Sequence, residues 1–483
     1  MTRKNSSNKA LALISSSTVV SQVATLLRAF IIMRTIGVEN YGIAVPMLLL
    51  IEFLNRLLEL NPAAVIVQDE KGATKKFRHA FQFMSLIRGV LFALIIVLLA
   101  VPLAVFNDLD SREYVMGFMF VGLVPLIRGC SHVDIFRQMR RRRFGNVALS
   151  QTSTPVATTV MVAMLCLFMN SFWVPLIARV IDAVNGLIMS FVVAERRWMI
   201  RFDGESMVRI IRFMLPLIVG GMVVFISNRG SQQLLSASDS LFGFEIPKAV
   251  VGTLAAAVLI AMIPGSIGAS VIQQVFAPRT AEIGRRGGNV ARLFEQVQAL
   301  GFTLGAAALI MLQAGSVIVP VLLTERFEGT APFLVALSVF GALRLSSTSA
   351  KTIALGLGKS KILMYGNFWS VLGIVCSIWV VYNQRSLVEI GYCMGIGEAL
   401  SYIARGIMVR RLVPSISLNA LFVKPALVLL CALAIGTVQR YTIDGMSLPL
   451  ALPLMFAWVV AGSALLSLFW APVRSIVSRR LAD

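Results

Sequence analysis

The sequence has few charged residues, few histidines and few cysteines. Charged residues make up 14% of the 483 residues and hydrophobic ones 57%, a balance that excludes a soluble globular domain of this size. Two histidines, His79 and His132, leave little material for a metal site. The five cysteines all lie in apolar runs without paired spacing, so they indicate neither disulfides nor metal ligands. We therefore expect no metal and no cofactor.

Motifs of catalysis and nucleotide binding are also lacking. No Ser/His/Asp order, no metal-ligand spacing and no phosphate-cradling glycine loop occurs in the sequence. The segments between apolar runs are too short to fold as separate domains. These absences favour a protein that is not an enzyme and does not use ATP directly.

The formal net charge of +21 does not indicate nucleic acid as a partner, because the basic residues flank apolar runs. Arg3, Lys4 and Lys9 precede a first apolar run that has no small-residue cleavage site, so we expect a retained first span.

Long apolar runs follow one another along the chain. A run of about 20 apolar residues is long enough to cross a bilayer as a helix, so we predict an all-α, polytopic membrane protein with about fourteen spans. The predicted spans are 11–36, 41–67, 80–106, 114–138, 147–170, 173–195, 209–235, 247–278, 297–320, 331–355, 363–382, 387–409, 422–440 and 449–471.

The basic residues predict the orientation of these spans. The loops and tails predicted on the same side of the membrane as the N-terminus hold 29 lysines and arginines, whereas the loops on the opposite side hold 5. Since basic loops stay in the cytoplasm, both termini are expected to be cytoplasmic.

Weak internal repetition divides the chain. At an offset of 216 residues Arg128 matches Arg344 and Asp182 matches Glu398, and at an offset of 201 Arg28 matches Arg229. Transporters are commonly built from such repeats. We predict two parallel six-helix lobes around a central cavity, 1–195 and 196–411, followed by an accessory helix pair and tail, 412–483.

One predicted span, 41–67, carries a polar stripe. Glu52, Asn55, Arg56 and Glu59 follow helical spacing on an otherwise apolar rod. A charge at the bilayer centre costs roughly 2.5–3.5 kcal/mol, so the stripe is expected to line a wet cavity. The alternative is a Glu52–Arg56 ion pair that only packs helices.

Arginines outnumber carboxylates deep inside the predicted spans. Fork-shaped guanidinium groups suit phosphate or carboxylate better than lysine does, so an anionic ligand is predicted. The alternative is that carboxylates hold the arginines, as Arg179 with Asp182 at i,i+3. Charged residues near span ends are expected to reach the headgroups instead: Arg34, Arg88, Asp134, Lys351, Glu389 and Arg405. The predicted substrate-binding arginines are Arg28, Arg56, Arg128, Arg179, Arg229 and Arg344, and the candidate ion-coupling carboxylates are Glu52, Glu59, Asp182 and Glu398.

Three segments carry a resemblance to a known family. LLRAFIIMRTIGVENYGIAV (26–45), FRQMRRRRFGN (136–146) and LGLGKSKI (355–362) resemble bacterial Wzx-type oligosaccharide flippases of the multidrug/oligosaccharidyl-lipid/polysaccharide exporter superfamily. In the first segment, Glu39-Asn40-Tyr41-Gly42 is similar to the (D/E)-x-(Y/F)-G element of that family. Fourteen spans are nearer to the lipid II flippase branch, where the last two helices form a groove for the lipid tail.

The resemblance implies alternating access through the central cavity. It implies an undecaprenyl-pyrophosphate-linked oligosaccharide as substrate, moved from the cytoplasmic to the periplasmic leaflet of the bacterial inner membrane for exopolysaccharide export. Membrane lipids and the polysaccharide polymerase and export machinery are the implied partners. The alternatives are an ion-coupled drug or cation antiporter of the same superfamily, an integral-membrane polymerase or ligase, and a regulatory scaffold.

Overall fold

The computed structural model consists of helices joined by short turns and irregular segments, with no strand, in the residues it describes, which are 2–57, 74–141, 144–285, 288–323, 325–359, 361–444 and 446–467. This confirms the predicted all-α, polytopic class. The described chain divides into two compact units, one formed by Met1–Phe225 and Gln232–Gly252, the other by Ile226–Ser231 and Thr253–Asp483. The predicted lobe boundaries, at 195/196 and 411/412, stay a prediction.

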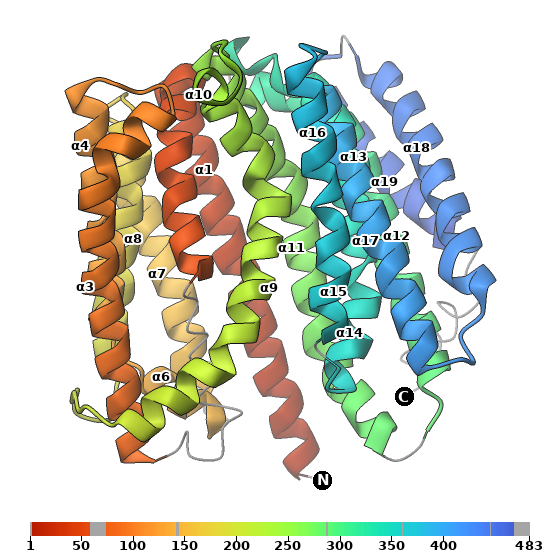
Figure 1. Cartoon of the computed structure of the whole chain (residues 1–483). Helices are drawn as coiled ribbons and strands as arrows, with labels where there is room; N and C mark the ends of the chain where they lie inside the picture. The colour runs from red at the N-terminus through yellow and green to blue at the C-terminus, as the bar shows by residue number, and fades with distance from the viewer. Residues whose placement is uncertain are drawn as a thin grey trace. The chain divides into compact units, whose positions relative to one another are not determined.

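The first unit holds the helices that carry most of the predicted arginines (Figure 1). They are α1 (Thr2–Leu57), α3 (Lys75–Phe106), α4 (Arg112–Val121), α5 (Leu123–Gly129), α6 (Asp134–Arg140), α7 (Phe144–Leu165), α8 (Trp173–Val192), most of α9 (Gly204–Ser236) and α10 (Ser238–Phe242).

The second unit holds the short stretch Ile226–Ser231 of α9 and most of the next long helix. Its elements are α11 (Lys248–Arg285), which starts in the first unit, α12 (Val290–Leu323), η2 (Glu325–Phe327), α13 (Thr330–Ser346), α14 (Thr348–Gly356), α15 (Lys361–Ser370), α16 (Leu372–Tyr382), α17 (Glu389–Leu412), the π-helical turn η3 (Asn419–Val423), α18 (Lys424–Ile443) and α19 (Leu448–Ser467).

Helix α1 covers two predicted spans and changes direction between them at Gly37. That residue has φ 77° and ψ 173°, a conformation open essentially to glycine alone. The predicted span 114–138 is likewise broken, since α4 and α5 are followed by α6 at an angle of 51°. The described chain has eight helical stretches long and apolar enough to cross a membrane, or nine if this bent pair is one span. The count of fourteen stays a prediction.

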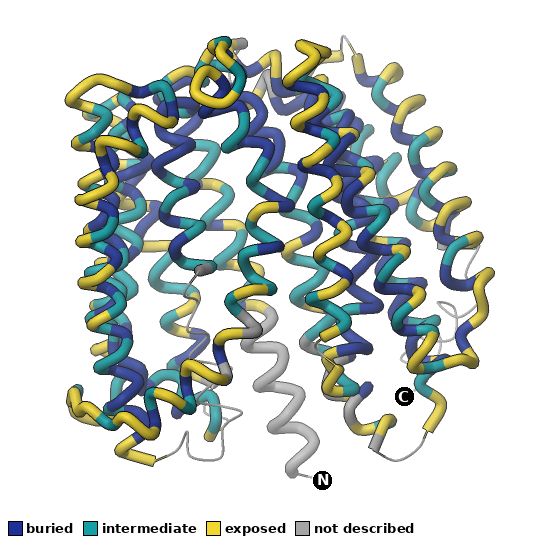
Figure 2. The backbone as a smooth tube through the Cα atoms, viewed as in Figure 1, coloured by how far each residue is buried: buried dark blue, intermediate teal, exposed yellow. Residues whose placement is uncertain are grey.

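Helix α3 shows how the spans meet the bilayer. Leu94, Leu98 and Val101 are exposed by 54%, 68% and 54%, and they recur at i, i+4 and i+7, which places them on one face. The opposite face buries Phe92 and Ile96, and exposed and buried stretches alternate along the helices in Figure 2. An exposed face that is apolar faces lipid, since water would not solvate it.

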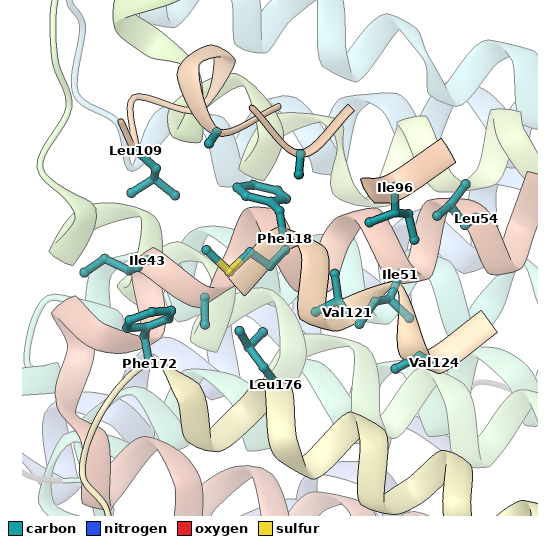
Figure 3. Close-up of a cluster of buried hydrophobic side chains, with 14 of the residues drawn as sticks. Ile43, Ile51, Leu54, Ile96, Leu109, Phe118, Val121, Val124, Phe172 and Leu176 are labelled. Carbon is teal, nitrogen blue, oxygen red and sulfur yellow. The ribbon is translucent and has the colours of Figure 1, made fainter. Parts of the chain in front are cut away.

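The core of the first unit lies between α1, α3, α4 and α8. Phe118 and Leu176 are fully buried against Ile43 and Ile51 of α1, with Phe172 alongside (Figure 3). Because lipid tails are as apolar as these side chains, close van der Waals packing holds such helices together. This core fixes α1 and α8, and thereby the charged residues on them.

The last two helices pack into the second unit. Val428, Ala432 and Leu466 of α18 and α19 share a buried cluster with Phe302 of α12 and Tyr402 of α17. The Tyr402 hydroxyl donates a hydrogen bond to the Leu421 carbonyl. Both helices therefore pack against the buried core of this unit, and their role as an accessory pair stays a prediction.

Candidate functional site

Asp182 on α8 is the centre of a charged cluster in the first unit. Arg28 of α1 donates from Nη1 to Asp182 Oδ1 at 3.1 Å, and Arg128 of α5 donates from Nη2 to Oδ2 at 3.3 Å. The side chains of Arg28, Arg128 and Asp182 are exposed by 9%, 35% and 19%. Three separate helices thus bring two guanidinium groups onto one carboxylate inside the predicted spans.

Arg179 adds a third positive charge to this cluster. It lies one turn before Asp182 on α8, and its charge acts on both Arg28 and Arg128. The i,i+3 bond between Arg179 and Asp182, which the sequence offers as the alternative, does not occur in the described chain, where Arg28 and Arg128 hold the carboxylate. One carboxylate against three arginines leaves an excess of positive charge, which suits an anion.

The first unit contains two cavities, of about 390 Å³ and about 340 Å³, and the second adjoins the Asp182 cluster. Arg128 and Asp182 form part of the wall of the 340 Å³ cavity, together with Gln151, Thr154 and Ser190. A guanidinium has five N–H donors, and Asp182 takes one from Arg128. The exposed part of Arg128 therefore offers donors to a ligand in the cavity.

The polar stripe of α1 lies beside a second, smaller cavity. Asn55 lines a space of about 20 Å³ with Arg88 of α3 and Arg128, about the size of one water molecule. Glu52 and Arg56 are half-buried on the same helix, and both have partners. Glu59 lies outside the described residues. The structure thus brings one residue of the stripe, Asn55, and Arg128 to the same small space.

Arg128 owes its position to the break in its span. Helix α5 ends at Gly129, and residues 130–133 turn the chain before α6 begins. A basic residue in the last turn of a helix also interacts favourably with the free carbonyl groups there. The unbroken span predicted from the apolar run gave no sign of this turn.

The second unit has a comparable cluster around Glu398 on α17. Glu398 Oε1 accepts hydrogen bonds from Ser347 at 3.1 Å and from Arg405 at 3.3 Å, and Lys351 Nζ lies 3.9 Å away. Glu398 and Arg405 are 4% and 1% exposed. Arg405 also bonds the Ser401 hydroxyl. A buried carboxylate is stable only when it is paired and hydrogen-bonded, and here both conditions hold.

Arg344 and Arg229 complete the set of predicted arginines. Arg344 Nη1 donates to Asn228 Oδ1 at 2.5 Å and lies over the Phe340 ring at 5.8 Å, while its charge acts on Glu398. Arg229 is half-buried on α9. Arg128 and Arg344 match at an offset of 216, as do Asp182 and Glu398, and each arginine lies near the carboxylate of its own unit.

Two residues expected to reach the headgroups are buried instead, so that prediction is wrong for them. Asp134 has 0% side-chain exposure and binds Arg78 at 3.2 Å and Arg137 at 2.5 Å. Arg405 is buried against Glu398. Both lie near span ends in the sequence, but neighbouring helices supply their partners, and apolar patterning alone does not report those neighbours.

No metal centre occurs in the part of the chain that the structure describes, since no three His, Cys, Asp or Glu side chains come together there. The chemistry that the two clusters offer is electrostatic, namely fixed cations beside single carboxylates.

Comparison with known proteins bears on this arrangement. The profile of the family described as "Polysaccharide biosynthesis protein" matches residues 31–332. No curated protein sequence matches the chain.

Solved structures share the fold. The lipid II flippase MurJ in its inward closed conformation has a TM-score of 0.71 at 12% identity, covering 98% of this chain and 100% of its own. An inward-facing multidrug resistance MATE family transporter of the MOP superfamily has a TM-score of 0.63 at 15% identity, covering 83% and 100%. A MOP superfamily transporter from Pyrococcus furiosus, described by the reversed polarity of its binding pocket, has a TM-score of 0.56 at 15% identity, covering 84% and 96%.

Proposed function

The chain belongs to the polysaccharide biosynthesis protein family, and from this premise we propose that it is a flippase for a lipid-linked oligosaccharide. Its substrate is an oligosaccharide on undecaprenyl pyrophosphate, moved from the cytoplasmic to the periplasmic leaflet of the inner membrane for polysaccharide export. Both termini lie in the cytoplasm, and the polymerase and export machinery takes over the product. In this role the protein is a transporter and not a catalyst.

The observation that carries the proposal is the Asp182 cluster. Arg28, Arg128 and Arg179 lie around one carboxylate beside a cavity of about 340 Å³ whose wall includes Arg128 and Asp182. A diphosphate presents several oxygens to such guanidinium groups and forms charge-assisted, bidentate bonds with them. The cavity has room for a diphosphate and an adjoining sugar but not for a whole oligosaccharide, so the remaining sugars extend beyond it.

Asp182 gives the cluster a way to exchange ligands. In the absence of substrate its carboxylate holds Arg28 and Arg128 in place. When the diphosphate takes these two arginines, Asp182 loses its counter-charges and is free to bind the coupling cation. Binding of the substrate and binding of that ion are then linked reciprocally, which makes Asp182 the first candidate for ion coupling, ahead of Glu52, Glu59 and Glu398.

A drug or cation antiporter of the same fold is the second candidate. Such a protein needs an acidic site that attracts cations. Asp182 and Glu398 are each surrounded by more basic groups than they can neutralise, so a cationic substrate would meet net repulsion.

The test measures flipping of the lipid-linked oligosaccharide in proteoliposomes. Arg28→Ala and Arg128→Ala should each slow flipping at least tenfold, since a charge-assisted hydrogen bond contributes roughly 1.5–3 kcal/mol. Arg28→Lys and Arg128→Lys should restore little, because the ammonium group lacks the fork. Arg292→Ala, a change at an exposed arginine, is the matched control.

Wild-type flipping by both alanine variants would contradict the proposal. Efflux of a cationic drug, lost in Asp182→Asn but not in the arginine variants, would favour the antiporter instead.

A further inference from the structure

The cavity of about 390 Å³ in the first unit is lined mainly by basic residues. Lys75, Arg78 and His79 come from the start of α3, and Arg196 and Arg197 come from the segment after α8. None of the lining residues belongs to the Asp182 cluster. We call this cavity the basic pocket.

The two acidic residues of the basic pocket are already bound. Asp134 accepts hydrogen bonds from Arg78 Nη1 at 3.2 Å and from Arg137 Nε at 2.5 Å. Glu195 Oε2 accepts one from Arg137 Nη2 at 2.8 Å. Arg137 lies behind the pocket and is 3% exposed. Both carboxylates are therefore committed to buried arginines, and little negative charge is left for the pocket itself.

The cations at the opening have no such partner. Within the described ranges, Lys75, Arg196 and Arg197 form no ion pair. Arg78 is 9% exposed, and its Nε is buried without a hydrogen-bond partner. A buried N–H without a partner is costly, and an anion with several oxygens would satisfy it.

The basic groups also repel one another. The charge of Arg78 is opposed by Arg137 and Arg196, and His79 lies in the field of Arg78, Arg201 and Lys75. Like charges held close together raise the free energy of the empty pocket. A bound anion removes this repulsion, so the arrangement favours an anionic ligand over a neutral one.

Apolar side chains at the edge of the pocket indicate where that anion comes from. Met199 lines the pocket and is 54% exposed, and Phe202, three residues further on, is 68% exposed. The Phe202 ring packs edge-on against Phe83 of α3, with centroids 5.7 Å apart. Exposed apolar residues beside basic ones, at the end of a span, are typical of a segment at the headgroup level of a bilayer.

We propose that the basic pocket binds the phosphate headgroup of an anionic membrane lipid, at a site distinct from the Asp182 cluster. The phosphate oxygens contact Arg78, Arg196 and Arg197, and Lys75 supplies further positive charge. The acyl or polyprenyl chain leaves the pocket past Met199 and Phe202. The inference does not depend on the proposed function, because it concerns binding and not transport.

The test measures lipid binding by the full-length protein. Native mass spectrometry in a neutral detergent would determine the affinity for phosphatidylglycerol, polyprenyl diphosphate and phosphatidylcholine, with inorganic pyrophosphate as a competitor. The variant is Arg196→Gln/Arg197→Gln, whose exposed side chains form no ion pair in the described chain. The control is Arg212→Gln/Arg292→Gln, which removes two exposed arginines elsewhere.

The pocket variant should bind an anionic lipid at least tenfold more weakly, since each basic group near an anionic surface contributes about fivefold. The control should bind as the wild type does, and phosphatidylcholine binding should be weak throughout. A loss confined to phosphatidylglycerol identifies a phospholipid as the ligand, and a loss confined to polyprenyl diphosphate identifies the carrier lipid.

Unchanged binding of both anionic lipids by the pocket variant would overturn the inference. An equal loss in the control would do the same, because it would mean that overall charge and not the pocket attracts the lipid. Competition by pyrophosphate without any dependence on a lipid chain would show a free anion site instead of a lipid site.

Discussion

Removing the charge of Glu398 tests whether its cluster stabilises the second unit. Glu398→Gln keeps the size of the side chain but leaves Arg405 without its counter-charge. Arg405 is 1% exposed, and its Nε and Nη1 already have no hydrogen-bond partner. Removing one partner of a buried ion pair costs about 3–5 kcal/mol. Since Lys351, at 3.9 Å, also loses its counter-charge, we expect the upper part of that range.

The assay is thermal unfolding in detergent, with a double-mutant cycle. For a unit of roughly this size, a loss of 3 kcal/mol lowers Tm by about 6 °C or more. Arg405→Met should also destabilise, whereas Glu398→Gln/Arg405→Met should lose less than the two single variants together, because Arg405 no longer remains as a buried charge without its partner. Glu389→Gln on the same helix, where the carboxylate is only half-buried, is the control. Additive losses, or a Glu398→Gln protein as stable as the wild type, would refute the reasoning.

Three further predictions concern packing and ion pairs. Gly366→Ala should lower the free energy of unfolding by about 1–3 kcal/mol, because the added Cβ would lie 2.2 Å from Arg405 Cγ. The control is Gly220→Ala, whose added Cβ meets nothing within 4 Å. Equal Tm values for the two variants would count against this prediction. Asp134→Asn should destabilise the protein by about 3–5 kcal/mol, since Arg78 and Arg137 both bind the fully buried carboxylate. Its unfolding midpoint would be compared with that of Asp110→Asn, a change at an exposed site. Truncation after Val413 should reduce the yield of folded protein, because it removes the Leu421 carbonyl that accepts hydrogen bonds from Tyr402 and Gln298. A truncated protein with the same Tm as the full chain would place α18 and α19 outside the core.

The sequence predicts the helical class well, because apolar runs and the bilayer leave few alternatives to a helix. It also singles out Arg128, Asp182, Arg344 and Glu398, since charges inside apolar runs are conspicuous. Their partners are harder to predict. The spacing offers Arg179, three residues earlier, as an alternative partner of Asp182, but Arg28 and Arg128 approach it from other helices.

For two other residues, the position within a span gave a wrong prediction of burial. Asp134 and Arg405 lie near span ends, where side chains commonly extend to the headgroups. The turn at residues 130–133 instead directs α6 so that Asp134 is enclosed, and Ser401 and Glu398 enclose Arg405. Such enclosure depends on contacts between segments distant in sequence, and neither hydropathy nor spacing contains them.

Gly37 has a genetic consequence. Every amino acid reached from a glycine codon by a single base change carries a side chain, and each would be strained in the conformation with φ 77° and ψ 173° that this residue adopts. Any missense change at codon 37 therefore strains the point where α1 changes direction. In a randomly mutated population under selection, missense changes at codon 37 should be rarer than silent ones.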